Sequence, residues 1–145
     1  MFSKACEYGI RSAIFIAKSS LKGERVGIKE IAREIDSPEA FTAKILQTLT
    51  REQLVESTKG VGGGFEVSEK QMKKVLLADI VNAIDGNSIY VGCGLGLPSC
   101  NEKKPCPIHY EFKEVRNKLK EVLTSTTLYD LAMGMAVGNT FLKRV

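Results

Sequence analysis

Residues 28–49 read IKEIAREIDSPEAFTAKILQTL, and this stretch decides the fold. Its apolar residues recur at three- and four-residue spacing, which is the period of one helix face. The period breaks at Asp36, and Ser-Pro-Glu at 37–39 is typical of a helix start, because serine caps, proline fits the first turn and glutamate suits the positive end of the helix dipole. The stretch therefore predicts a helix at 28–35 and a second helix starting at Ser37, which is the spacing of a helix-turn-helix.

The second helix of this pair has an apolar and a polar face. We expect the core side to carry Phe41, Ile45, Leu46 and Leu49, and the solvent side to carry Glu39, Thr42, Lys44, Gln47, Thr48 and Arg51. In a helix-turn-helix the second helix enters the DNA major groove, which is wide enough to admit it. The alternative is a small helical core whose polar residues are only solvated, and the helices alone do not separate the two.

The residues that follow predict a β-hairpin. Residues 54–57 and 65–67 alternate apolar and polar side chains, and TKGVGGG at 58–64 lies between them. A glycine-rich centre between alternating runs is typical of two strands with a flexible tip. A nucleotide phosphate loop is discounted, because this run lacks a lysine–serine or lysine–threonine ending and leads into a strand. A hairpin after three helices is a wing, and a winged helix-turn-helix favours DNA binding.

Eight residues are candidates for DNA contacts. Backbone amides at the start of the recognition helix can meet phosphate, and Lys44 can meet phosphate or a guanine edge. Lys59 lies beside glycines, which permit close approach of the backbone to DNA. The full set is Ser37, Glu39, Thr42, Ala43, Lys44, Thr48, Lys59 and Gly60. We therefore expect double-stranded promoter DNA to be the partner.

Apolar residues near the end of the chain step by four, three, four and three positions, at Ile108, Phe112, Val115, Leu119 and Val122. This spacing is an a/d seam sustained for about two heptads. A helix that packs only on its own core usually follows the 3.6-residue period. The narrower seam favours a symmetric homodimer contact, with plain core packing as the alternative.

The remaining sequence is also helical in character. Residues 4–18 and 75–85 predict helices, and Gly86 ends the latter. Thr127-Leu128-Tyr129-Asp130 is a capping-box variant that opens a terminal helix. The predicted fold is mostly α with a small β-hairpin. Its parts are a winged helix-turn-helix DNA-binding domain at 1–86, a cysteine-rich loop at 87–109, and a dimerisation helix with a C-terminal helix at 110–145.

Composition narrows the functional class. The 145-residue chain carries a net charge of +4, which permits nucleic-acid binding without requiring it. No apolar run reaches the roughly 18 residues that a membrane span needs, and the N-terminus lacks a signal-peptide pattern, so we expect a cytoplasmic protein without membrane association. Neither a nucleophile–base constellation nor a Cys-x-x-Cys motif is present, so we expect no enzyme.

Residues 93–109 read CGLGLPSCNEKKPCPIH and hold three of the four cysteines and the only histidine. The prolines and glycines make this segment a poor helix and a poor strand. Six residues separate Cys93 from Cys100, five separate Cys100 from Cys106, and two separate Cys106 from His109. Zinc sites favour closer cysteine pairs, whereas longer loops suit an iron–sulfur cluster held by thiolates, with histidine as a substitute. We therefore favour a cluster site, with zinc or redox-active thiols as alternatives.

Several motifs together resemble the Rrf-type winged-helix transcriptional regulators, a bacterial family with IscR-, NsrR- and CymR-like branches. They are Tyr8-Gly-Ile-Arg-Ser-Ala, Ile28-Lys-Glu-Ile-Ala, the segment from Ser37 to Leu49, Gly60-Val-Gly-Gly-Gly-Phe, the cysteine triad and Thr127-Leu-Tyr-Asp-Leu. The resemblance covers the chain to about residue 132. It implies a homodimeric transcription regulator in which the long helix after the cysteines pairs with its twin, while the recognition helix and the wing contact DNA.

The resemblance also implies a cofactor. Cluster-binding members commonly hold a two-iron two-sulfur (2Fe–2S) cluster with three cysteines, which match Cys93, Cys100 and Cys106. In IscR-like members a histidine just after the third cysteine is the fourth ligand, which matches His109. In NsrR-like members an acidic residue in the first helix of the other protomer completes the site, which matches Glu7. We prefer His109 because it lies in the same loop, and a cluster-free thiol-based regulator, for example of cysteine metabolism, is the alternative.

Two positions depart from the family pattern. Gln53 stands where the family often has glycine, which alters the end of the recognition helix and not the binding surface. Ala43 stands where some IscR-like members carry a glutamate that discriminates bases, so the resemblance leaves the operator sequence open.

Overall fold

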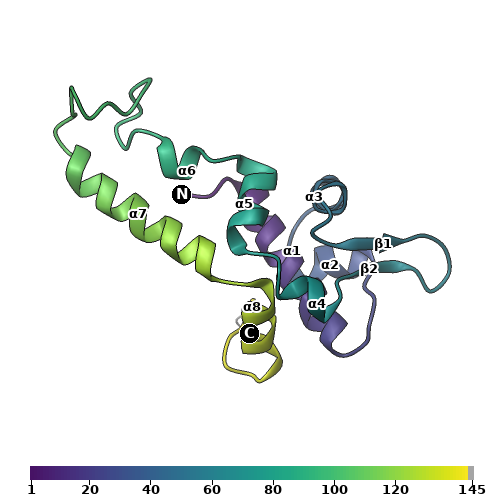
Figure 1. Ribbon diagram of the computed structural model, residues 1–145. Helices are drawn as coiled ribbons and strands as arrows, with labels where there is room; N and C mark the ends of the chain where they lie inside the picture. The colour runs from purple at the N-terminus through teal and green to yellow at the C-terminus, as the bar shows by residue number, and fades with distance from the viewer. Residues whose placement is uncertain (144–145) are drawn as a thin grey trace.

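The computed structural model describes residues 1–143, and helices form most of it (Figure 1). In chain order the elements are α1 (Lys4–Leu21), α2 (Ile28–Ile35), α3 (Glu39–Arg51), β1 (Glu56–Thr58), β2 (Gly64–Glu66), α4 (Glu69–Met72), α5 (Leu77–Asp85), α6 (Ser88–Val91), α7 (His109–Ser125) and α8 (Leu128–Ala136). The two strands form one antiparallel sheet. The predicted mostly helical fold with a small hairpin is confirmed. The one-turn helices α4 and α6 were not predicted, since neither is long enough to show a hydrophobic period.

Helix α1 is the centre of the core. Its apolar stripe is buried, and the helix packs against α2, α3, α5 and α8. Ser3 caps it by accepting a hydrogen bond from the backbone N–H of Cys6 at 3.0 Å. The helix continues to Leu21, about one turn beyond the predicted end, and the chain turns away where Gly23 adopts a φ of 75°.

The helix-turn-helix consists of α2 and α3, and α2 has the predicted bounds. Asp36 turns the chain between them in the left-handed region, with φ 54° and ψ 57°. Aspartate tolerates this conformation better than most residues, because its short side chain can hydrogen-bond locally. Helix α3 begins at Glu39 with Pro38 as its N-cap, so the predicted cap at Ser37 is displaced by one residue.

Two side chains of α3 face the opposite way from the prediction. Thr42 is fully buried, because its hydroxyl donates to the carbonyl of Pro38 at 2.9 Å and also hydrogen-bonds Ser37, so burial leaves no unpaired polar atom. Phe41 is 39% exposed and packs edge-on against Tyr8, with the ring centroids 5.6 Å apart. The buried stripe of α3 is therefore Thr42, Ile45, Leu46 and Leu49.

The wing is a short hairpin that projects from the body of the molecule (Figure 1). Strand β1 starts later than predicted, since Leu54 and Val55 are buried in the core. On the other side of β2, the N–H of Phe65 donates to the carbonyl of Val26 at 2.8 Å, and the N–H of Val26 donates back at 3.2 Å. Val26 therefore anchors the wing to the segment between α1 and α2.

In this anchor, Gly64 is a position that does not tolerate a larger side chain. Its φ is 136°, and a Cβ there would lie 2.8 Å from the carbonyl oxygen of Val26, which cannot move without breaking its hydrogen bond from Phe65. We expect Gly64→Ala to lower the free energy of unfolding by about 2–3 kcal/mol, measured by denaturant titration. Gly60→Ala is the matched control, because φ there is 91° but the added methyl meets open space. Equal losses in both variants would contradict the steric argument.

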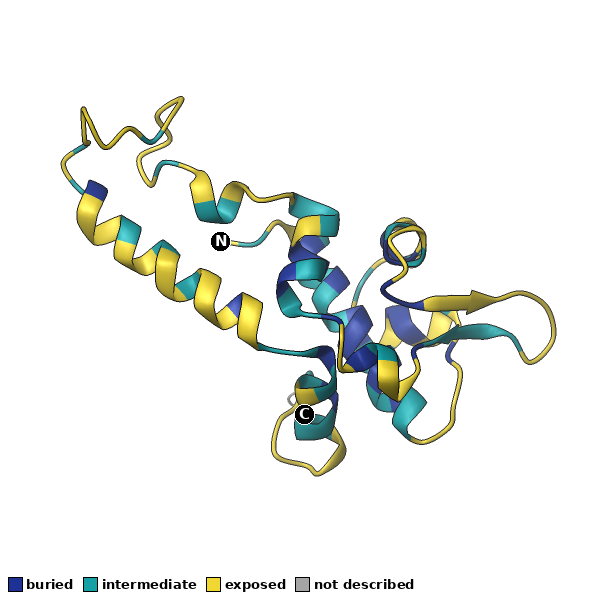
Figure 2. Ribbon diagram, in the orientation of Figure 1, coloured by how far each residue is buried: buried dark blue, intermediate teal, exposed yellow. Residues whose placement is uncertain are grey.

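Helix α7 lies mostly outside the core and runs beside α6, joined to it by a long irregular loop at 92–108 (Figure 1). Most of α7 is exposed, in contrast to α1 (Figure 2). At the end of α7 the chain returns to the core, where the N–H of Leu77 donates to the carbonyl of Thr126 at 2.9 Å. The N–H of Leu128 donates to the carbonyl of Val75 at 2.8 Å. The C-terminal end of α7 is therefore fixed to the start of α5.

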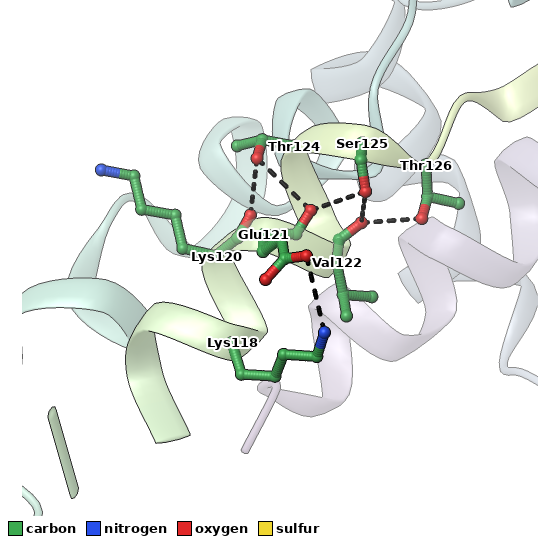
Figure 3. Close-up of polar contacts among 7 residues, drawn as sticks. All are labelled: Lys118, Lys120, Glu121, Val122, Thr124, Ser125 and Thr126. Carbon is green, nitrogen blue, oxygen red and sulfur yellow. Dashed lines mark hydrogen bonds and ion pairs between the residues drawn. The ribbon is translucent and has the colours of Figure 1, made fainter. Parts of the chain in front are cut away.

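Three hydroxyl groups close the last turn of α7 (Figure 3). The side chains of Thr124, Ser125 and Thr126 each donate to the carbonyl four residues earlier at 2.7 Å. Carbonyls in the last turn of a helix have few backbone donors, and the hydroxyl of Thr126 supplies one to the carbonyl of Val122. Helix α8 follows with the predicted cap, in which Thr127 accepts from the N–H of Asp130, and it packs on α1.

Candidate functional site

The exposed surface of α3 offers a set of candidate DNA contacts that differs from the predicted one. Thr42 is excluded, because its side chain is buried and its hydroxyl is already hydrogen-bonded. The predicted residues of this segment that stay exposed or partly exposed are Ser37, Glu39, Ala43, Lys44 and Thr48. Gln47 is also exposed, and it follows Lys44 at the spacing that places two side chains on one helix face. Gln47 is therefore an additional candidate for DNA contact. The sequence had already placed it on the polar side of this helix.

The tip of the wing is exposed and carries Lys59 and Gly60. Arg25, which was not among the predicted contacts, lies beside this tip. Its guanidinium donates to the carbonyl of Gly62 at 3.4 Å and forms an ion pair with Glu66 at 3.2 Å. Arg25 reaches the wing because the next residue, Val26, pairs with β2. This pairing joins distant parts of the chain, so no local sequence pattern predicts that Arg25 lies beside the wing. The wing therefore presents two cations.

The loop between α6 and α7 carries the candidate ligands. Cys93, Cys100 and Cys106 are partly buried free thiols. His109 is the first residue of α7 and is only 3% exposed. The Sγ of Cys100 lies 3.3 Å from the Nδ1 of His109, so α7 presents its first side chain to the middle cysteine of the loop.

Cys93 lies in a turn of the loop, where the backbone N–H of Leu95 donates to its sulfur at 3.4 Å. The pKa of the Cys93 thiol is lowered by the backbone N–H groups of Leu95 and Leu97, and the Cys106 side chain lowers it further. A lower pKa increases the fraction of thiolate, which is the form that binds metals. Among residues 1–143, the hydrogen bond between Cys100 and His109 is the one direct contact that joins two of the four candidate ligands. Within residues 1–143, no three His, Cys, Asp or Glu side chains lie close enough together to hold a metal ion.

The ring of His109 is the clearest sign that the loop suits a metal–sulfur group. Its Nε2 is buried and has no hydrogen-bond partner among the described residues. Leaving a buried polar atom unpaired costs about 1–3 kcal/mol, so such an atom calls for an explanation. Three thiolates and a histidine suit an iron–sulfur cluster by their chemistry, because histidine replaces cysteine as a ligand in some two-iron centres. A single zinc ion instead needs four ligands around one point. The donor set therefore fits an iron–sulfur cluster.

Cys6 is set apart from the loop cysteines. It is fully buried in α1, and burial raises the pKa of its thiol to about 12, with the carboxylate of Asp85 adding to the rise. Alkylating reagents attack the thiolate, which Cys6 does not form at about pH 8. We expect iodoacetamide to label three of the four cysteines in the folded, metal-free protein and all four in denaturant, as counted by mass spectrometry. Rapid labelling of Cys6 in the native state would contradict its burial.

The residues expected to act between protomers lie on α7 and at the start of α1. Along the predicted seam, Phe112, Val115 and Val122 are exposed, and Ile108 and Leu119 are partly buried. An open cavity of about 400 Å³ between α6 and α7 is lined by Ile89 and by the middle of this seam. Helix α7 therefore keeps an apolar surface that its own protomer leaves uncovered. Glu7 forms an ion pair with Lys4 at 3.9 Å, and its role as a partner's ligand stays a prediction.

Comparison with known protein families identifies the family of this chain. The profile of the Rrf2 family, described as iron-dependent transcriptional regulators, matches residues 2–134. The chain belongs to the Rrf2 family. A curated relative, a putative HTH-type transcriptional regulator of Aquifex aeolicus, is 28% identical over 133 residues, which span 90% of each chain. The resemblance seen in the sequence motifs is therefore confirmed.

Solved structures agree with this Rrf2 assignment. CymR (YrzC), the global cysteine regulator of B. subtilis, superimposes with a TM-score of 0.75 at 26% identity, covering 92% of this chain and 96% of that one. T. potens IscR superimposes with a TM-score of 0.73, covering 97% and 91%, and its 18% identity supports the fold alone. This Rrf2 protein is thus a DNA-binding transcriptional regulator and not an enzyme. Among the helices of residues 1–143, none has the length and apolar character of a membrane span.

Proposed function

We propose that this Rrf2 protein is a cytoplasmic homodimer whose binding to promoter DNA is controlled by a 2Fe–2S cluster. Cys93, Cys100, Cys106 and His109 would hold the cluster. The observation that carries the proposal is the buried ring of His109, which faces Cys100 through one nitrogen and, among residues 1–143, has no hydrogen-bond partner at the other. A bound cluster supplies one-electron redox chemistry and reactivity toward oxidants or nitric oxide.

The loop is placed to act on the dimer helix. It ends at His109, the first residue of α7, whereas the last turn of α7 is held to the core next to Thr126 and Leu128. A change in the order of the loop therefore acts on one end of a helix whose other end is fixed. In a dimer joined through α7, such a change alters the spacing of the two α3 helices, which has to match the operator half-sites. The signal must favour one arrangement over the other to shift DNA binding.

Lys59 is expected to contribute a phosphate contact from the wing tip, where it is exposed. We expect Lys59→Ala to weaken binding to the protein's own promoter by about tenfold and to reduce the salt slope by about one per wing, measured by fluorescence anisotropy across a salt series. Lys120→Ala is the control, because it removes the same charge from an exposed position on α7. If Lys59→Ala binds like the parent protein at every salt concentration, the wing does not contact DNA as proposed.

A cluster-free, thiol-responsive regulator is the second candidate. Its support is the likeness to CymR, together with the lack of three close ligands within residues 1–143. The two candidates differ in metal content after anaerobic purification. About two irons and two sulfides per chain, with visible absorption, would support the cluster. Colourless protein with stoichiometric zinc, or with no metal at all, would overturn it.

A further inference from the structure

Arg116 lies on α7 beside the ligand loop and contacts the loop at two points. Its Nη1 donates to the carbonyl oxygen of Gly92 at 2.8 Å, and its Nη2 lies 3.3 Å from the Sγ of Cys100. Gly92 immediately precedes Cys93, so one guanidinium joins the start and the middle of the loop to the helix. The planar fork of arginine holds its donors in fixed directions, which allows two acceptors to be bound at once.

The sulfur of Cys100 is thereby held by two residues of the same helix. Arg116 follows His109 by seven positions, so both side chains project from one face of α7. Each places a nitrogen 3.3 Å from the Cys100 Sγ. Both residues are at least partly shielded from solvent, and hydrogen bonds are stronger in such surroundings than at an open surface.

Other contacts between the loop and α7 are less specific. Lys113 pairs with Glu102, but the two side chains are 43% and 62% exposed, and solvent-exposed ion pairs contribute little. The ring of Phe112 lies against the backbone at Gly94, where an added Cβ would come within 2.8 Å of it, and this contact is apolar and without direction. Neither contact reaches a cysteine sulfur.

We propose that Arg116 is the positioning residue of the ligand loop, which holds Gly92 and Cys100 against α7 and so connects the state of the loop to the dimer helix. Arg116 acts through Cys100 and would not itself bind iron. Where the cluster is concerned, this inference rests on the proposed function. A hydrogen bond from a cation to a ligand sulfur reduces the negative charge on that sulfur, which raises the reduction potential of a cluster.

The first test uses metal-free protein and hydrogen exchange read by mass spectrometry. In Arg116→Gln we expect the amides of residues 92–101 to exchange about tenfold faster, since two hydrogen bonds are lost. Arg116→Lys should lose most of the same protection, because one ammonium lacks the fork that spans both acceptors. Lys113→Gln is the matched control, with a change below about twofold. Unchanged exchange in Arg116→Gln, full protection in Arg116→Lys, or equal losses in Lys113→Gln would each overturn the proposal.

The second test uses protein reconstituted with iron and sulfide. We expect Arg116→Gln to release its cluster to a chelator several-fold faster than the parent and to show a lower reduction potential, with Lys113→Gln unchanged in both. Equal release rates and potentials would overturn the part of the inference that concerns the cluster. If the parent protein takes up no cluster, the proposed function fails, while the exchange experiment still decides whether Arg116 holds the loop.

Discussion

Replacing Cys100 with alanine is expected to leave the protein with less than about a tenth of the parent's iron and sulfide after anaerobic purification. The middle cysteine is the meeting point of the site, because His109 and Arg116 both place a nitrogen 3.3 Å from its sulfur. Its loss would remove one ligand and the contact that orients another. Iron and acid-labile sulfide assays with visible absorption spectra measure the effect directly.

Three further variants separate loss of a ligand from loss of structure. Cys6→Ala should keep its cluster, because Cys6 is buried in α1 among core residues. His109→Ala and Glu7→Gln decide the fourth ligand: loss of iron in the first alone supports the ligand within the loop, and loss in the second alone supports the partner's α1. If Cys100→Ala keeps its full iron content and unfolds like the parent, the assignment of the cluster to this loop is wrong.

Local signals in the sequence were sufficient for most of the fold. The bounds of α2, the end of α5 at Gly86 and the capping box at Thr127 each depend on residues within one or two turns. The predicted orientation of α3 was partly wrong. Either Phe41 or Thr42 can join Ile45, Leu46 and Leu49 on one helix face at three- or four-residue spacing. Phe41 is the more hydrophobic choice for the core, but Thr42 is the residue buried, since its hydroxyl donates to the carbonyl of Pro38, the N-cap of the same helix.

Part of the candidate site was likewise predictable from local sequence, and part of it was not. The cysteines and His109 stood out because their types and their proline- and glycine-rich surroundings are visible in one short segment. The contact between Cys100 and His109 was not predictable, because it depends on how the loop folds back onto the first turn of α7. Arg116 and Arg25 were missed for the same reason: their partners lie 16 to 41 residues away in the chain. On sequence alone each is one cation among 21 lysines and arginines.

Introducing a charge into the seam of α7 is expected to separate the protomers. Val115 is 55% exposed, in the middle of the predicted dimer contact. In a symmetric dimer one substitution appears twice, and each buried carboxylate without a partner costs about 2–3 kcal/mol. The combined cost of about 4–6 kcal/mol corresponds to a dimer about a thousandfold weaker or more. We expect Val115→Glu to sediment as a single chain of 15.9 kDa at concentrations where the parent sediments at twice that mass.

The same variant should bind the operator with an affinity lower by about a hundredfold or more, because a monomer contacts one half-site and makes no contacts at the other. Asn117→Glu is the matched control, since it places the same charge on an exposed part of α7 two residues away and outside the seam. Sedimentation velocity and anisotropy on the two variants, with unfolding curves to confirm that both are folded, give the comparison. If Val115→Glu remains a dimer, α7 is not the dimer helix, and the path from the cysteine loop to the two α3 helices would have to run through another surface.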